Sequence, residues 1–296
     1  MIHSPASTAR RFARSFFPAC TAAAAFLLIP AATAQDAPAP AAAQAGTKND
    51  WLYAGSDIPR DTAWQFGVLP NGVRYAVRNN GVPPGQVSIR VRMDVGSMFE
   101  TDKERGFAHL LEHLTFRGSE HIPDGEAKRI WQRFGVTFGS DSNAQTTPTQ
   151  TAYQLDLPSV TPANLDESMK LLAGMVREPL ISETAVTAER GVVMSELRES
   201  DGPQKRIADQ TTAHLFAGQL LGDRSPIGTN ESLAAARAGT VKAFHDRWYR
   251  PDRAVVVIAG DGDPAEFARL IAKYYGDWKA DGPAPKQPDF GKPNAK

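Results

Sequence analysis

Several short stretches of the chain alternate between apolar and polar residues, which is the pattern of strands that bury one face. The alternation is clearest over residues 87–95 and returns over residues 150–157. Residues 65–69 and 73–78 flank a Pro-Asn-Gly sequence, and an Asn-Gly turn between two such runs predicts a β-hairpin. Residues 254–259 are apolar throughout, so we expect a fully buried strand there.

Other stretches carry the signals of helices. Pro162 follows Thr161, and a proline at the first helical position favours a helix start. Ser182 is a typical N-cap residue, and Gly135 is a typical helix end. The predicted helices cover residues 106–116, 126–134, 162–176, 182–199, 240–249 and 264–275. Because strands and helices interleave without a regular βαβ repeat, we predict an α+β fold, a largely antiparallel sheet with helices packed on one face.

The first 34 residues have the features of a secretory signal. Three arginines precede an apolar stretch, and Ala32-Thr33-Ala34 fits a small-x-small cleavage site. A membrane anchor is the alternative, but a span needs about 20 apolar residues, and this stretch is shorter and contains prolines. Residues 1–34 are therefore predicted to be a signal peptide. The protein would be exported, periplasmic or secreted if the source is bacterial, with no membrane association after cleavage.

Two further segments are too poor in large apolar residues to form a core. Residues 35–50 are rich in alanine and proline and are predicted to be a linker, and residues 280–296 form a similar, linker-like tail. Residues 51–279 between them are the predicted working domain.

Composition narrows the chemistry that this domain can carry. The 296 residues include 33 basic and 33 acidic residues, a balance that argues against a nucleic-acid partner, because such domains are normally strongly basic. The single cysteine, Cys20, lies within the predicted signal peptide, so a thiolate zinc cluster is excluded. A metal site in this protein must be built from His, Asp and Glu.

Residues 106–116 contain the strongest candidate for such a site. His109 and His113 are four residues apart and share one helix face, so both imidazoles can reach one ion. Zinc suits two neutral imidazoles, and a catalytic site adds a third ligand and an open position for water. Glu112 flanks the ion without necessarily binding it, which is where a general base is needed. The order H-x-x-E-H is the inverted form of the commoner zinc-protease motif.

The third ligand must come from another element, and the predicted helix 182–199 offers carboxylates. Glu189 and Glu196 are seven residues apart, or two helical turns, so they share a face. One of them can bind the metal while the other orients a histidine ligand. The spacing alone does not say which glutamate does which.

These motifs together resemble a known family. Gly96-Ser97 and Glu100 precede GFAHLLEHLTFRGS (106–119), and Glu189 to Glu196 form an E-x6-E element. This combination resembles the zinc-binding core of the insulinase/pitrilysin metallopeptidases, the inverzincins, which include the mitochondrial processing peptidases. The resemblance covers roughly residues 62–279.

The resemblance implies a role for each of these residues. Glu196 becomes the third zinc ligand, with one Zn²⁺ per chain, and Glu189 becomes the supporting carboxylate. Asn143 and Ala144 match the family's active-site edge strand, where the substrate backbone pairs as an added strand. The resemblance also implies that this fold is one of two homologous halves that close around the substrate like a clamshell. The second half supplies an Arg/Tyr pair.

The expected function is a zinc-dependent endopeptidase that hydrolyses extended peptides with a metal-activated water and Glu112 as the base. The tail resembles the family's inter-half connection, so we expect a second homologous half in the same parent chain, with a separate subunit as the other arrangement. The chain alone can be inactive without it. The alternative is a non-catalytic half that binds peptides or a partner, and a weaker one is a hydrolase of a non-peptide bond.

Overall fold

The computed structural model describes residue 51, residue 54 and residues 56–294. The predicted signal peptide and the linker 35–50 lie outside the described residues. Among the helices described, none combines the length and the apolar character that crossing a membrane requires.

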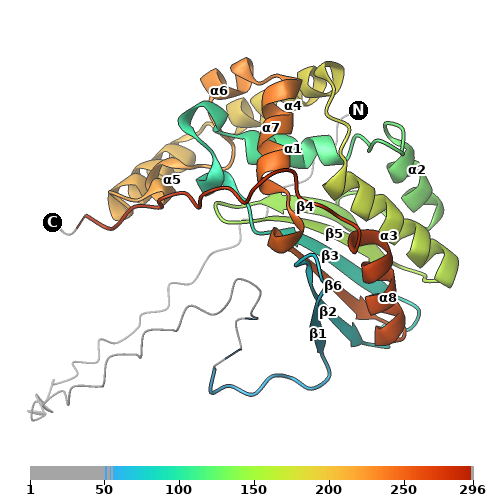
Figure 1. The fold of residues 1–296 in the computed structure, drawn as a ribbon. Coiled ribbons are helices and arrows are strands. Elements are labelled where there is room, and N and C mark those ends of the chain that lie inside the picture. The colour runs from blue at the N-terminus through green and yellow to red at the C-terminus, as the bar shows by residue number, and fades with distance from the viewer. Residues whose placement is uncertain (1–50, 52–53, 55, 295–296) are drawn as a thin grey trace, which may run out of the picture. The chain divides into compact units, whose positions relative to one another are not determined.

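A six-stranded sheet forms one layer of the domain, and its strands follow the order β1-β2-β6-β3-β5-β4 (Figure 1). Every neighbouring pair is antiparallel except β2 and β6, which are parallel. The strands are β1 (Gln65–Val68), β2 (Arg74–Asn79), β3 (Val87–Met93), β4 (Ser142–Thr146), β5 (Thr151–Leu157) and β6 (Ala254–Gly260). The prediction of a largely antiparallel sheet is confirmed, and β4 is one of its two edge strands.

The alternation in β3 follows from its position between β6 and β5. Val91 pairs with Val256 on one side and with Tyr153 on the other, and all three are buried. The opposite face of β3 carries polar side chains that form ion pairs, such as Arg90 with Asp156 at 2.7 Å. One face of β3 is therefore apolar and the other polar, as the period of two in its sequence predicts.

Helices form the second layer and cover the apolar face, with α3 and α8 lying over the strands in Figure 1. The helices are α1 (Phe107–Thr115), α2 (Glu126–Arg133), α3 (Pro162–Arg177), α4 (Glu183–Ser200), α5 (Pro203–Leu215), α6 (Asn230–Ala235), α7 (Ala238–Trp248) and α8 (Pro264–Tyr275). The predicted start signals are confirmed, because Thr161 accepts a hydrogen bond from the backbone N–H of Asn164 and Ser182 accepts one from that of Ala185.

Two helices differ from the prediction. Helix α5 was not predicted, and it begins at Pro203, since proline is favoured at the first helical position. The short helix α6 carries no long apolar period and was not predicted.

The segment after α8 stays in contact with the domain. Arg253 donates a hydrogen bond to the side chain of Gln287 at 2.9 Å. The rings of Phe290 and Phe99 pack edge-on, with their centroids 5.7 Å apart. The domain boundary at residue 279 stays a prediction.

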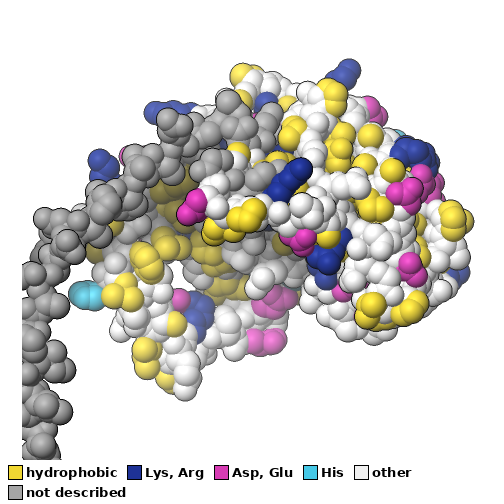
Figure 2. Space-filling model, turned by 90° about the horizontal axis from the view of Figure 1, so that it is seen from below, with side chains coloured by type: hydrophobic (Ala, Val, Ile, Leu, Met, Phe, Trp, Pro, Cys, Tyr) yellow, Lys and Arg dark blue, Asp and Glu magenta, His cyan; other side chains and the backbone are white. Residues whose placement is uncertain are grey.

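Charged side chains are mixed over the surface. Figure 2 shows basic and acidic residues interspersed on the described part of one face, with neither sign gathered into a large patch.

Candidate metal site

Helix α1 presents its two histidines because its other side is held in the core. Leu110, Leu111 and Leu114 are fully buried, whereas His109 and His113 are only partly buried on the remaining face. The helix begins after Gly106, whose φ of 90° is a left-handed conformation that favours glycine.

Glu100 anchors the first turn of α1. Its carboxyl oxygens accept hydrogen bonds from the backbone N–H groups of Gly106 at 2.9 Å and Ala108 at 2.8 Å. These are N–H groups that a helix start leaves without partners inside the helix. Burial raises the pKa of Glu100 to about 8, although the backbone hydrogen bonds and Arg224 act in the opposite direction. In the sequence Glu100 was only part of the family resemblance, and this anchoring role was not predicted.

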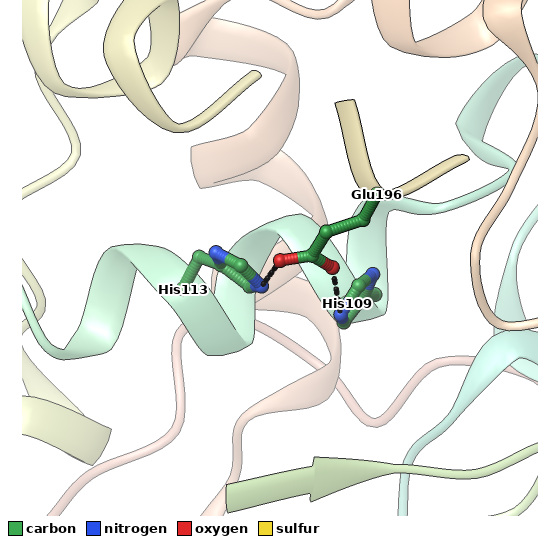
Figure 3. A group of neighbouring side chains, drawn as sticks. All are labelled: His109, His113 and Glu196. Carbon is green, nitrogen blue, oxygen red and sulfur yellow. Dashed lines mark ion pairs between the residues drawn. The ribbon is translucent and has the colours of Figure 1, made fainter. Parts of the chain in front are cut away.

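The structure brings His109, His113 and Glu196 together, and Figure 3 shows the carboxylate of Glu196 between the two imidazoles. Nε2 of His109 lies 3.6 Å from Oε2 of Glu196, and Nε2 of His113 lies 3.6 Å from Oε1. Hydrogen bonds of this kind are shorter, about 2.7–3.2 Å.

The 3.6 Å spacing suits a shared ion. In a tetrahedral zinc site with bonds of about 2.0–2.2 Å, neighbouring ligand atoms lie about 3.4 Å apart. One ligand atom from each of the three residues lies within 4.8 Å of the other two. Two imidazole nitrogens and one carboxylate oxygen form a donor set that zinc accepts, so the residues fit this ion.

Glu189 occupies the other side of His113. Its Oε2 lies 3.2 Å from Nδ1 of His113, and its Oε1 accepts a hydrogen bond from Nη1 of Arg117 at 3.3 Å. The partly buried helix α4 carries both glutamates, and its Val193 is fully buried whereas Val192 is exposed. The spacing of the two glutamates left their roles open and the family resemblance implied Glu196 as the ligand; in the structure it is Glu196, not Glu189, that faces both histidines.

The protonation of the histidines follows from their surroundings. Burial, together with the neighbouring His113, lowers the pKa of His109 to about 4, so this imidazole is neutral at pH 7. Burial acts in the same direction on His113, but the hydrogen bond to Glu189 and the charges of Glu196 and Glu112 outweigh it and raise the pKa of His113. A metal ion at this site would therefore replace a proton on His113 more often than on His109.

Glu112 lies on the same helix, beside this group. Its side chain is largely buried, and burial raises the pKa of the carboxyl group. The hydroxyl of Thr146 on β4 donates a hydrogen bond to its Oε2 at 2.5 Å. Thr146 was not among the residues singled out in the sequence, because a threonine in a polar segment carries no signal of its own.

Asn143 and Ala144 lie on β4, an edge strand of the sheet. Oδ1 of Asn143 accepts a hydrogen bond from the backbone N–H of Ala144 at 2.9 Å. A cavity of about 560 Å³ adjoins this strand and reaches the candidate metal site. Its lining includes Glu112, His113, Asn143, Phe116, Phe138 and Lys128.

A second group of ligand-type residues lies on a surface turn, where Nε2 of His121 is 3.5 Å from Glu178 and Glu120 is nearby. His121 and Glu120 are exposed.

Comparison with known proteins gives the family. The family model described as insulinase (peptidase family M16) matches residues 75–224, and the one described as the peptidase M16 inactive domain matches residues 236–296. The chain therefore belongs to the insulinase family of peptidases, and the resemblance seen in the sequence is confirmed.

Individual relatives agree with this assignment. The chain is 34% identical over 220 residues to the probable zinc protease PqqL of Haemophilus influenzae, which covers 74% of this chain and 24% of the relative. It is 31% identical to the chloroplast stromal processing peptidase of Pisum sativum, which covers 77% of this chain and 18% of the relative. The chain thus spans about a quarter of the PqqL relative's length.

The fold also matches solved structures. The first half of the periplasmic protease PqqL from Escherichia coli superimposes with a TM-score of 0.73 at 30% identity, covering 78% of this chain and 49% of that one. This match confirms the α+β fold as that of an M16 protease half.

Proposed function

We propose that this chain is the catalytic half-domain of a zinc-dependent endopeptidase that hydrolyses extended peptides. One observation carries the proposal: Glu196 lies 3.6 Å from both histidines of an H-x-x-E-H helix, with the Glu112 carboxylate beside them. Membership of a family with named zinc proteases supports the same reaction.

His109, His113 and Glu196 would hold the ion. A zinc ion supplies a Lewis acid that polarises a carbonyl and lowers the pKa of a water to about 7. Glu189 orients His113 through Nδ1, so that Nε2 points to the site. These roles use every residue that the sequence proposed for metal binding.

Glu112 moves the protons of the reaction. As a carboxylate it accepts one proton from the attacking water, whose oxygen forms the new bond to the scissile carbonyl carbon. It then donates that proton to the amine nitrogen as the peptide bond breaks, and so returns to its ionised form. The charge of the base is therefore the same before and after each turnover.

The edge strand β4 would hold the substrate. A strand at the edge of a sheet has backbone groups free to pair, and an extended peptide can add there as a further strand. Asn143 and Ala144 lie on β4, next to the cavity that reaches Glu112. We therefore propose these two residues as substrate-binding.

A second homologous half would complete the enzyme. The E. coli relative is described as having a first half, and the chain matches 49% of that half-structure but 26% of the complete one. Its description as a periplasmic protease supports export of this chain by residues 1–34. We propose that the second half lies in the same parent protein and that the substrate is a peptide.

Replacing the base tests this function. The full-length gene product and its Glu112→Gln variant should contain the same zinc by elemental analysis, while the variant's kcat on a peptide mixture falls by about 100-fold or more. Glu199→Gln, at an exposed position on α4, is the matched control and should cleave normally. A zinc-loaded Glu112→Gln protein that cleaves at the wild-type rate contradicts the proposal. A wild-type protein that binds peptides without cleaving them supports the non-catalytic alternative.

A further inference from the structure

Thr146 links the edge strand β4 to the Glu112 carboxylate. The two residues are 34 positions apart, and the Thr146 hydroxyl donates to Oε2 of Glu112. This hydrogen bond restricts the orientation of the Glu112 carboxylate.

Strand pairing holds Thr146, and backbone hydrogen bonds hold the turn that follows it. It pairs with Thr151 across the β4–β5 ladder. The turn that follows accepts two backbone hydrogen bonds, from Ser97 to the carbonyl of Thr147 at 3.2 Å and from Met98 to that of Pro148 at 2.9 Å. The hydroxyl of Thr146 thus comes from a segment with little freedom to move.

The approach of this turn to the segment before α1 is close. A Cβ atom at Gly96 would lie 2.1 Å from the carbonyl oxygen of Thr147, which no side chain tolerates. A few residues later Glu100 accepts hydrogen bonds from the first turn of α1. The turn after β4 therefore bonds the segment that leads to α1, and Thr146 on β4 bonds Glu112 of α1 directly.

We infer that Thr146 is the positioning residue of the general base. It binds one oxygen of Glu112 and leaves the other available for proton transfer. Because β4 is also the strand proposed to pair with the substrate, one strand sets the positions of both the base and the peptide. The inference rests on the proposed function.

The cost of losing this contact follows from what the base itself contributes. A positioned general base contributes about 10²–10⁴-fold to a rate, and its contribution depends on correct geometry. Thr146 acts only through orientation, so its removal should cost part of that factor, about tenfold or more in kcat. Binding of peptide and zinc does not use the hydroxyl and should change little.

The test compares three variants of the full-length gene product. Thr146→Val removes the hydroxyl at nearly constant shape, Thr146→Ser keeps it, and Thr149→Val removes an exposed hydroxyl from the same hairpin. We expect Thr146→Val to lower kcat about tenfold or more, with KM and zinc content within about twofold of wild type. Thr146→Ser and Thr149→Val should keep kcat within about threefold. An unchanged kcat in Thr146→Val, an equal loss in Thr146→Ser, or a change confined to KM overturns the inference.

The outcome for Thr146 is separable from that for the proposed function. If wild-type protein shows no Glu112-dependent cleavage, the proposed function fails, and crystal structures of the variants decide about Thr146. Glu112 should keep its wild-type rotamer in Thr146→Ser and leave it in Thr146→Val. An unmoved Glu112 in Thr146→Val overturns the positioning role.

Discussion

The carboxylate of Glu189 lies 3.2 Å from Nδ1 of His113, although the two residues are 76 positions apart and on different helices. An ionised carboxylate can only accept a hydrogen bond, so in the neutral imidazole of His113 Nδ1 carries the proton and Nε2 keeps a free lone pair. That lone pair faces Glu196, as a metal-binding nitrogen should. In the proposed site, this pairing gives Glu189 a role distinct from that of the ligand Glu196.

Removal of this carboxylate should weaken metal binding. In Glu189→Gln the amide can present its N–H₂ group to Nδ1, which no longer favours the tautomer that binds through Nε2. Loss of such a partner typically costs about 10–100-fold in metal affinity, and we expect a loss in this range. Competition with a chromophoric zinc chelator measures it, with Glu199→Gln as the control. Equal affinity in wild type and Glu189→Gln would show that Glu189 does not support the ligand.

Glu100 should make stability depend on pH in a defined direction. Burial raises its pKa from 4.5 to about 8, so between these values the folded state holds a proton that the unfolded state has lost. The free energy of unfolding therefore falls as the pH rises through this window, by at most about 1.4 kcal/mol per pH unit. This stabilisation is complete below pH 4.5 and is lost as the pH rises through about 8.

Urea unfolding at about pH 6 and about pH 9 tests this dependence. Wild type should be less stable at the higher pH, and Glu100→Gln, which cannot ionise, should lose less of its stability over the same interval. The same change in both proteins would mean that Glu100 does not titrate in this range.

Two glycines offer a matched pair of substitutions. Gly106 has a φ of 90°, and a Cβ atom there would lie 2.9 Å from the Cα of Gly228. Gly106→Ala should therefore lower the free energy of unfolding by about 1–3 kcal/mol. Gly191 lies within α4, and a Cβ atom at this position would meet no other atom within 4 Å, so Gly191→Ala should raise stability by about 0.5–1 kcal/mol. Thermal unfolding of both variants checks the opposite signs, and two shifts of the same sign would contradict the expectation.

The parts of the fold that the sequence predicted are those with strong local signals. Strand β3 alternates because one of its faces is buried, and α3 and α4 have capping residues at their first turns. Strand β4 has the sequence SNAQT, without apolar alternation, and its structure comes from pairing with β5. A pattern search therefore could not find it, and only the family resemblance pointed to Asn143 and Ala144.

The residues of the candidate site also fall into those with a local sequence signal and those that only the folded chain brings together. His109, Glu112 and His113 were predictable because their spacing lies within one helix. The choice between Glu189 and Glu196 depends on how α4 packs against α1, which the spacing of the two glutamates does not contain. Glu100 and Thr146 contact α1 through bonds formed only in the folded chain.

Anomalous diffraction at the zinc edge tests the proposed metal site most directly. Crystals of the zinc-loaded full-length protein should show one peak in this domain, bonded to Nε2 of His109, Nε2 of His113 and the carboxylate of Glu196 at about 2.0–2.2 Å. A peak found only at the surface group of Glu120, His121 and Glu178, or no peak near His109, would contradict the site.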